Sequence, residues 1–359
     1  MINKPQTINS LTGIRGFACL LVLFAHASND LELAPWMSLV GMGKYGVYLF
    51  FVLSAFLLTK QFLDANRDEA LSLNFLRHYF IRRVLRIYPL FLFALLAYYL
   101  FGVIYGVVIY DNLDGFMILK SLALLDAEGI FWTIPVEFQY YFLLPIVAAL
   151  YIALMHRPML AAVMSVVFIV VWGWFFSPEF TNTVIPFLPM FVCGSFAAYA
   201  QKRIEARRRD DSAKYFIWSN SLALACFLAF FALAPYFVIG VFHIEVERTF
   251  AHREFLLFGA LSSLLILAVI NGNGIVKKMM ESSAFTFMGK ISFSAYLFHM
   301  IFLPIVVLFH TGGKEWKLLL FMAYTISFST LTYMLVERPL SKVHTFKRLF
   351  SKARSVVIR

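Results

Sequence analysis

The sequence predicts an all-α polytopic membrane protein, a bundle of about ten transmembrane helices with both termini in the cytoplasm. Of the 359 residues, 61% are hydrophobic and 14% are charged, against about 45–50% and about 25% in soluble domains. The mean hydropathy is +0.79. The apolar residues form runs of about 20, the length that crosses a hydrocarbon core. This composition excludes a disulfide-rich secreted scaffold, a disordered chain and a water-soluble enzyme.

The apolar stretches that are long enough to span a membrane follow one another along the whole chain. They lie near residues 9–28, 44–63, 84–109, 133–155, 159–176, 182–200, 216–238, 254–271, 284–309 and 317–336. The stretch 115–126 is too short to cross, so we expect it to lie at the interface or to re-enter. Arg15 interrupts the first run and no small-x-small cleavage site follows. We therefore expect a retained helix rather than a cleaved signal peptide.

The distribution of Lys and Arg predicts the orientation of these spans. With the N-terminus in the cytoplasm, the inside loops carry 23 of the 31 basic residues and the outside loops carry six. Cytoplasmic loops are enriched in Lys and Arg, so both termini are expected inside a multi-pass protein of the cell (inner) membrane. No long hydrophilic stretch remains. Residues 1–359 are therefore predicted to form one membrane domain with no appended soluble domain.

The net charge of +11 does not indicate a nucleic-acid partner. The basic residues cluster in loops between apolar runs and not in a basic patch with interleaved aromatics. Cys19, Cys193 and Cys226 all lie in apolar runs, without CxxC or metal-ligand spacing. We expect buried thiols and no metal site.

Five ionisable residues fall inside the predicted spans: Arg15, His26, Glu137, Lys290 and His299. Each is a functional candidate, because an ionisable group inside a membrane is costly. With a helix rise of about 1.5 Å per residue, His26 lies about 16 Å beyond Arg15. Glu137 lies about 6 Å below the outer face and His299 about 22 Å from the inner face. His26, Glu137 and His299 are therefore predicted at similar depth in the outer half.

The cationic residues are predicted at the cytoplasmic side. Arg15, Lys290 and the group Arg82, Arg83 and Arg86 all lie near that side. Arg83 and Arg86 are three residues apart and share a helix face. Guanidinium groups bind phosphate bidentately, so a gathering of them suits a phosphate-bearing ligand. The structural alternatives are the positive-inside bias for the arginines, snorkelling for Lys290 and a hydrogen-bonded core histidine for His299.

Six short motifs follow one another along the chain. They are Leu11-Thr-Gly-Ile-Arg15 with His26, Gly46 to Leu58, Arg82 to Pro89, Trp132 to Tyr141, Ile291 to His299, and Glu337-Arg338-Pro339. In this order they resemble the integral-membrane acyltransferase 3 family from end to end. Three positions depart from the family pattern: Ala55 replaces a common Gly, Phe138 a frequent second acid, and Ile301 a Pro. These departures bear on the shape of the acceptor site.

The resemblance implies transfer of an acyl group, usually acetyl from acetyl-CoA, to a hydroxyl. The acceptors in such a family are sugars of surface polysaccharides, lipopolysaccharide, peptidoglycan or lipid-linked glycans. The expected partners are therefore an acyl-CoA co-substrate, a carbohydrate acceptor and the lipid bilayer, with no permanently bound cofactor. The acceptor, its regiochemistry, the acyl chain and the oligomeric state are not defined by the sequence.

We expect different motif residues to take different roles in the reaction. His26 is the expected general base, and Glu137 is the anion expected to stabilise its imidazolium. Arg15, Arg83 and Arg86 are expected to bind the CoA phosphates, and Trp132 and Tyr141 to stack on a sugar. Tyr296 and His299 are expected to orient the acceptor or the thioester carbonyl. Ser54, within the second-span motif, is a further residue expected to bind substrate. A covalent acyl-His or acyl-Ser54 intermediate is an open alternative to direct transfer.

Two other classes of protein are alternatives to an acyltransferase. A transporter of a glycan lipid or small solute would use the buried His and Glu as a proton relay. Transporters often show paired repeats with interrupted half-helices. Pro186 and Pro189 interrupt the sixth span, but the other half has no counterpart. A scaffold or sensor would not require Arg15, His26 and Glu137 together.

The charge bias predicts which loops are accessible from outside the cell. A cysteine introduced within residues 111–128 should react with a membrane-impermeant maleimide in intact cells, and one within residues 202–214 should react only after lysis. The two stretches carry one and six basic residues, respectively. Labelling of the second stretch in intact cells would overturn the orientation and the depth estimates built on it.

Overall fold

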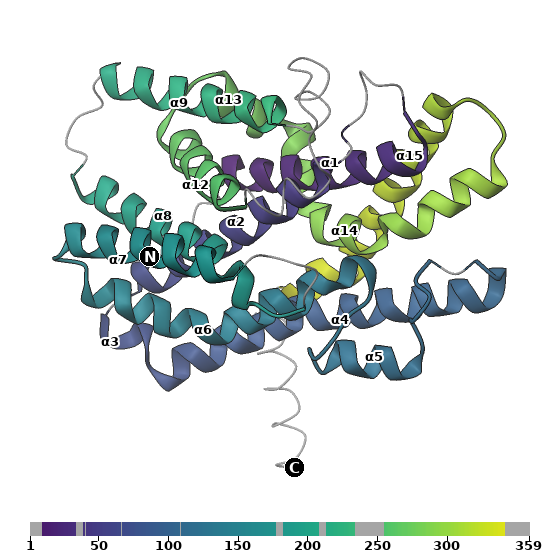
Figure 1. The fold of residues 1–359 in the computed structure, drawn as a ribbon, viewed down its shortest axis with the longest axis horizontal. Helices are drawn as coiled ribbons and strands as arrows, with labels where there is room; N and C mark the ends of the chain where they lie inside the picture. Colours follow the sequence, from purple (N-terminus) through teal and green to yellow (C-terminus); the bar gives the residue numbers. More distant parts are fainter. Residues whose placement is uncertain are drawn as a thin grey trace, which may run out of the picture.

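The computed structural model describes residues 9–33, 39, 41–65, 67–107, 109–176, 182–207, 213–233 and 255–341. All regular structure in these ranges is helical, which confirms the predicted all-α membrane bundle (Figure 1). Many of the long helices run roughly along the horizontal direction of Figure 1, whereas others cross it obliquely. The predicted cytoplasmic ends at residues 1–8 and 342–359 lie outside the described residues.

Each predicted span overlaps one long helix of the structure. The elements are α1 Asn9–Asp30, α2 Gly43–Asp64, α3 Arg67–Ala70, α4 Leu73–Tyr105, α5 Gly115–Leu122, η2 Gly129–Trp132, α6 Thr133–Ala153, α7 Pro158–Phe175, η3 Ile185–Phe187, α8 Leu188–Arg207, α9 Ala213–Ala232, α12 Phe255–Asn271, α13 Ile275–Met280, α14 Ser283–Phe309, α15 Lys314–Thr332, η4 Tyr333–Glu337 and α16 Arg338–Ser341. By length and composition, seven helices of the described chain can cross a membrane. The total of ten spans stays a prediction.

Helix α4 differs most from the sequence-based expectation. It begins at Leu73, eleven residues before the predicted span, because the Ser72 side chain accepts a hydrogen bond from the Phe75 backbone N–H (3.3 Å) and caps it. It ends at Gly106, whose φ of 65° is the left-handed conformation of a helix C-terminus. Arg83 and Arg86 therefore lie well inside a continuous 33-residue helix.

The backbones of α1 and α14 are in direct contact, and only glycine permits this. A Cβ atom added to Gly289 of α14 would lie 1.8 Å from the Thr12 carbonyl oxygen of α1. One added to Gly16 would lie 2.1 Å from the carbonyl oxygen of Phe285. Small residues allow such close helix packing in membranes, where apolar surface alone provides little drive for association. The contact fixes α1, which carries Arg15 and His26, against α14, which carries Tyr296 and His299.

Helix α6, which carries Glu137, is held by a buried chain of hydroxyl groups. The Ser195 hydroxyl of α8 lies 2.7 Å from the Thr59 hydroxyl of α2 and 2.6 Å from the Tyr140 hydroxyl of α6. Polar groups in hydrocarbon are satisfied by one another across helices, as here. The three helices are thereby joined next to the polar residues described below.

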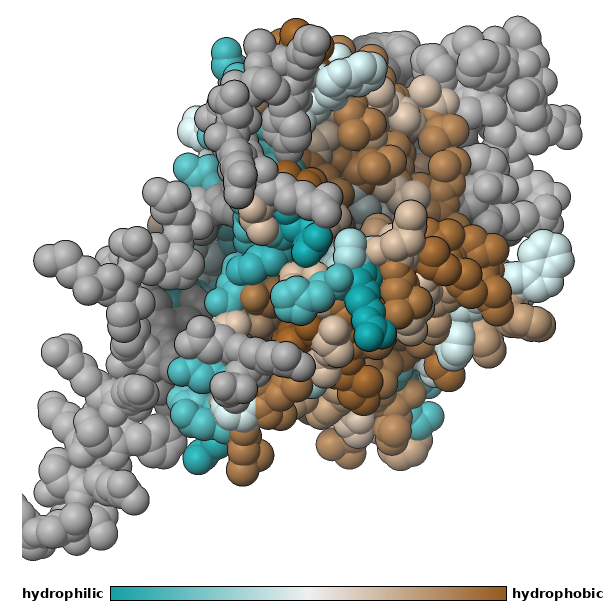
Figure 2. Space-filling view, turned by 90° about the vertical axis from the view of Figure 1, so that its left-hand side faces the viewer, coloured by the Kyte–Doolittle hydropathy of each residue, from teal (hydrophilic) through white to brown (hydrophobic). Residues whose placement is uncertain are grey.

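The periphery of the bundle suits a lipid environment, and its ends are polar. Within α7 only Ala161 and Ser165 are buried, and the exposed remainder is apolar, with Trp174 at 84% exposure. Lys60 and Lys202 pair with Glu205 and Asp64 where α2 and α8 end. Figure 2 faces the left-hand side of Figure 1, where hydrophilic side chains gather and are bordered by hydrophobic ones.

The α1–α14 contact predicts a large effect of a single methyl group. Gly16→Ala should destabilise the protein by about 1–3 kcal/mol, because the added Cβ overlaps a backbone oxygen. Gly115→Ala is the matched control, since a Cβ there meets nothing within 4 Å. Thermal unfolding of both variants in detergent measures the difference. Equal stabilities would contradict the close contact.

Candidate active site

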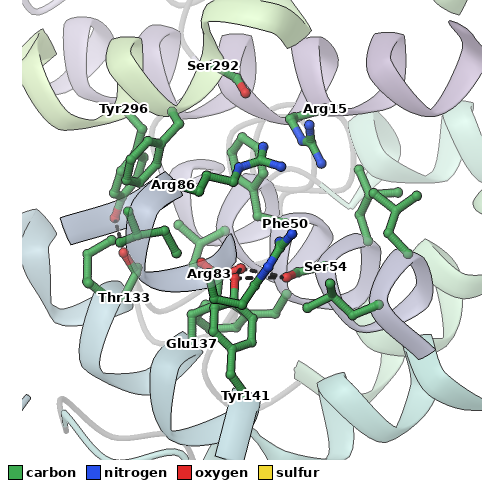
Figure 3. A pocket seen from close by; sticks show the side chains of 18 of the residues that line it. Arg15, Phe50, Ser54, Arg83, Arg86, Thr133, Glu137, Tyr141, Ser292 and Tyr296 are labelled. Atoms are coloured by element: carbon green, nitrogen blue, oxygen red, sulfur yellow. Dashed lines mark hydrogen bonds between the residues drawn. The ribbon is translucent and has the colours of Figure 1, made fainter. Parts of the chain in front are cut away.

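Two cavities lie inside the bundle, and residues of α1, α2 and α14 line both of them. The first, named the arginine cavity, has a volume of about 230 Å³. Its polar lining consists of Arg15, Ser54, Gln61, Arg83, Arg86, Thr133, Glu137, Tyr141, Ser292 and Tyr296, and apolar residues of α2 complete its wall (Figure 3). The predicted shared face of Arg83 and Arg86 is confirmed, because both line this cavity.

The three guanidinium groups of this cavity are not neutralised by direct ion pairs. Figure 3 shows Arg15 reaching from α1, and Arg83 and Arg86 from α4, into the same space. Among the described residues, none of the three lies within 4.0 Å of a carboxylate oxygen. The Arg83 Nε atom is buried without a hydrogen-bond partner there, and its Cζ atom lies 6.0 Å from the Tyr141 ring centroid. Unpaired buried cations are costly, so the arrangement favours an anionic ligand.

Glu137 organises the opposite wall of the arginine cavity. One of its oxygens accepts hydrogen bonds from the Ser54 hydroxyl and from the Tyr141 hydroxyl, each at 2.5 Å. Ser54 comes from α2, whereas Tyr141 lies one turn further along α6. The carboxylate therefore joins the two helices and aligns two hydroxyl groups facing the arginines.

Glu337 is a second carboxylate of this region, and the sequence analysis did not assign it a role. It is buried, accepts a hydrogen bond from the Ser294 hydroxyl (3.2 Å), and lies within electrostatic reach of Arg15 and Arg86. It ends the π-helical turn Tyr333–Glu337, and such turns are frequent at functional sites. The sequence feature that could have identified Glu337 is its position as an acidic residue at the end of an apolar span, within the motif Glu337-Arg338-Pro339.

The second cavity, named the histidine cavity, has a volume of about 460 Å³. Its polar lining consists of His26, Asn29, Lys44, Tyr48, Tyr110, Trp132, Asn182 and Tyr296. Val47 and Tyr296 line both cavities, so the two meet at these side chains. The Tyr296 hydroxyl donates to the Ile130 carbonyl (2.7 Å) and accepts from the Thr133 hydroxyl (3.2 Å). These bonds hold its ring at the junction.

The His26 ring lies beside the ring of His299, with 5.1 Å between the ring centroids. His299 is completely buried and lines neither cavity. Its Nδ1 atom is 2.7 Å from the Tyr296 carbonyl oxygen. The structure thus pairs two of the three groups that were predicted at similar depth.

The predicted partnership of Glu137 with His26 stays a prediction. Glu137 lines the arginine cavity, where it is bound to Ser54 and Tyr141, whereas His26 lines the histidine cavity. Distance along a helix gives depth but not the direction in which a side chain points, so two groups at similar depth can line different cavities. Of the two residues expected to stack on a sugar, Tyr141 lines the arginine cavity and Trp132 lines the histidine cavity.

The loop that contributes Asn182 to the histidine cavity is held by Gln139 of α6. The Gln139 side chain donates to the Asn182 carbonyl (3.1 Å) and accepts from the Val184 backbone N–H (2.8 Å). The Asn182 amide in turn donates to Asp126. Gln139 belongs to the Trp132-to-Tyr141 motif, but only the fold shows its partners. Within the described ranges no three His, Cys, Asp or Glu side chains are grouped to hold a metal ion.

Comparisons with known proteins bear on this architecture. Residues 8–337 match a family model described as "Acyltransferase domain". The chain is 24% identical to "Putative peptidoglycan O-acetyltransferase YrhL" of Bacillus subtilis, over 95% of this chain and 56% of that protein. It is 21% identical to "Peptidoglycan O-acetyltransferase OatA" of Listeria monocytogenes, over 93% of this chain and 56% of the relative.

A third relative matches along nearly its whole length. The chain is 21% identical to "Nodulation protein 10" of Rhizobium leguminosarum bv. viciae, over 94% of both chains. By contrast, the chain spans little more than half the length of the two peptidoglycan O-acetyltransferase relatives. No solved structure matches the chain significantly.

Proposed function

The chain belongs to the acyltransferase 3 family of membrane O-acetyltransferases, and on that premise we propose that it transfers an acetyl group from acetyl-CoA to a carbohydrate hydroxyl. One observation carries the proposal. A cavity with three unpaired arginines meets, at Tyr296, a second cavity that contains His26. An anionic donor and a neutral acceptor can therefore approach one junction from two cavities.

The arginine cavity is the proposed donor site. CoA carries several phosphate groups, and the three guanidinium groups offer bidentate partners for them. The pantetheine arm would enter the cavity while the nucleotide stays at its mouth. The positive-inside bias supports a cytoplasmic supply of the donor in the cell membrane.

His26 is the proposed general base at the junction. The acceptor hydroxyl gives its proton to His26 while its oxygen attacks the thioester carbonyl carbon. The new C–O ester bond forms, the C–S bond breaks, and the CoA thiolate takes the proton from the His26 imidazolium. An imidazole can both accept and release a proton near neutral pH, which suits both halves of this transfer.

Glu137 and Ser54 support a second route through a covalent intermediate. The Ser54 hydroxyl donates to Glu137 at 2.5 Å, and a hydroxyl bonded to a carboxylate base is the arrangement of an activated nucleophile. The Ser54 oxygen would attack the thioester carbonyl carbon while Glu137 takes the hydroxyl proton, and the CoA thiolate would leave and receive that proton. The acceptor oxygen would then attack acyl-Ser54, and the released Ser54 oxygen would take up the proton of the acceptor hydroxyl. In the direct route, Glu137 holds Ser54 and Tyr141 in the donor site instead. Ser54→Ala separates the two routes, because only the covalent one requires its oxygen.

The acceptor is proposed to be a carbohydrate of the cell envelope. Two of the relatives above carry names that specify peptidoglycan, which makes peptidoglycan fragments the first acceptors to assay. Trp132 and Tyr110 in the histidine cavity provide aromatic faces, and Asn29 and Asn182 provide amide groups. A transporter with a proton relay is the alternative, and membership of an acyltransferase family argues against it.

The donor site predicts different effects of neighbouring arginines. Arg83→Ala or Arg86→Ala should weaken CoA binding roughly 10–100-fold, because a charge-assisted hydrogen bond to phosphate is lost. Arg82→Ala is the matched control: Arg82 lines neither cavity and donates to the His78 carbonyl. Calorimetric titration of the purified variants with CoA measures the difference. Equal affinities for all three would leave these arginines with a role in topology only.

If His26 is the general base, removing its side chain should lower the rate of acetyl transfer without weakening CoA binding. His26→Ala should lower transfer of radiolabelled acetyl to peptidoglycan fragments by roughly 10²–10⁴-fold, with CoA affinity unchanged. His78→Ala is the control, since His78 is an exposed histidine bonded to the Asn74 carbonyl. Full activity of a correctly inserted His26→Ala protein would remove His26 from the mechanism.

A further inference from the structure

We propose that His299 is a positioning residue that acts through His26, by accepting a hydrogen bond from one nitrogen of the His26 ring. This inference rests on the proposed function, in which His26 is the general base. It gives His299 a different role from the orientation of substrate expected from the sequence, because His299 lines neither cavity.

The tautomer of His299 follows from its backbone partner. The Nδ1 atom lies 2.7 Å from the Tyr296 carbonyl oxygen. A carbonyl oxygen only accepts hydrogen bonds, so Nδ1 carries the proton. In the neutral ring the Nε2 atom is then a lone-pair acceptor. The ring sits one turn beyond Tyr296 on α14 and is fixed by this bond.

The Nε2 atom of His299 is a buried acceptor that requires a donor. The side chain has 0% exposure, and within the described part of the chain Nε2 has no hydrogen-bond partner. Buried polar atoms are almost always satisfied, so an exception calls for an explanation. The ring of His26 lies 5.1 Å away between centroids, and a rotation of that ring or one bridging water would complete a hydrogen bond to Nε2.

The surroundings of His26 supply no alternative carboxylate partner. The charged and titratable residues that line the histidine cavity with it are Lys44, Tyr48, Tyr110 and Tyr296, and no Asp or Glu of the described chain lines it. A histidine base normally has a hydrogen-bond acceptor that sets its tautomer. Here the neutral Nε2 atom of His299 takes the place of the carboxylate.

The geometry assigns the two nitrogens of His26 to different tasks. A Cβ atom added to Gly43, which lines the histidine cavity, would lie 3.9 Å from His26 Nε2. Nε2 therefore points toward the cavity, and Nδ1 is left to donate to His299. The unprotonated Nε2 then takes the proton of the acceptor hydroxyl. As the imidazolium forms, the bond from Nδ1 to His299 becomes charge-assisted and strengthens.

Two conservative variants separate this role from a structural one. In His299→Asn the amide takes the place of Nδ1 and can keep the bond to Tyr296, but it leaves no acceptor for His26. In His299→Gln the amide oxygen reaches the place of Nε2 and restores that acceptor. The proposal predicts that the Asn variant loses roughly 10–100-fold in kcat, with KM for acetyl-CoA unchanged. The Gln variant should recover most of this loss. A structural role predicts the reverse order, and that order would overturn the proposal.

The tautomer of His26 provides a test that needs no acceptor substrate. ¹⁵N NMR of histidine-labelled protein should show His26 protonated at Nδ1 in the wild type and a mixture of tautomers in His299→Asn. His26→Ala identifies its signals. Protonation at Nε2 in the wild type would overturn the inference, even if the Asn variant were unstable. It would leave the proposed function intact, since that depends on the activity of His26→Ala.

Discussion

The contact between the backbones of α1 and α14 is the constraint on which the rest of the site depends. Gly16 of α1 and Gly289 of α14 bring these helices so close that a Cβ at either position would overlap a carbonyl oxygen of the partner. Helix α1 carries Arg15 and His26, and α14 carries Tyr296 and His299. A contact without side chains between them allows little sliding or rotation. The spacing between the two imidazole rings is therefore set by the backbone.

Two cavities of different chemical character meet at Tyr296 and Val47. On one side of Tyr296, three guanidinium groups face Glu137 and lie near Glu337. None of these three groups forms a direct ion pair with a described residue. On the other side, the cavity is lined by aromatic rings, amides, Lys44 and His26. Buried unpaired charge costs free energy of folding. A ligand that supplies the missing anion offsets this cost, so the unpaired arginines are consistent with a donor site.

Much of the fold could be predicted from the sequence, because a backbone inside a membrane must satisfy its hydrogen bonds internally and few structures do so. Runs of about 20 apolar residues must form helices there, and each predicted span contains one. The start of α4 was missed, since hydropathy does not register the cap at Ser72. The gathering of Arg15, Arg83 and Arg86 was also predicted. The partnership of His26 with Glu137 stays a prediction, because depth along a helix leaves the direction of a side chain undetermined. The place of Glu337 in the site could not be predicted, because it depends on the contact between α14 and the π-helical turn.

The central claim is that a donor from one membrane face meets an acceptor from the other at Tyr296. Proteoliposomes with the protein in one known orientation test it most directly. Acetyl-CoA would be supplied on one side only, and peptidoglycan fragments on the same or the opposite side. The account predicts acetylated fragments only when donor and acceptor are on opposite sides, with the donor on the side of the positively charged loops. Product formed only when both are on the same side would contradict it.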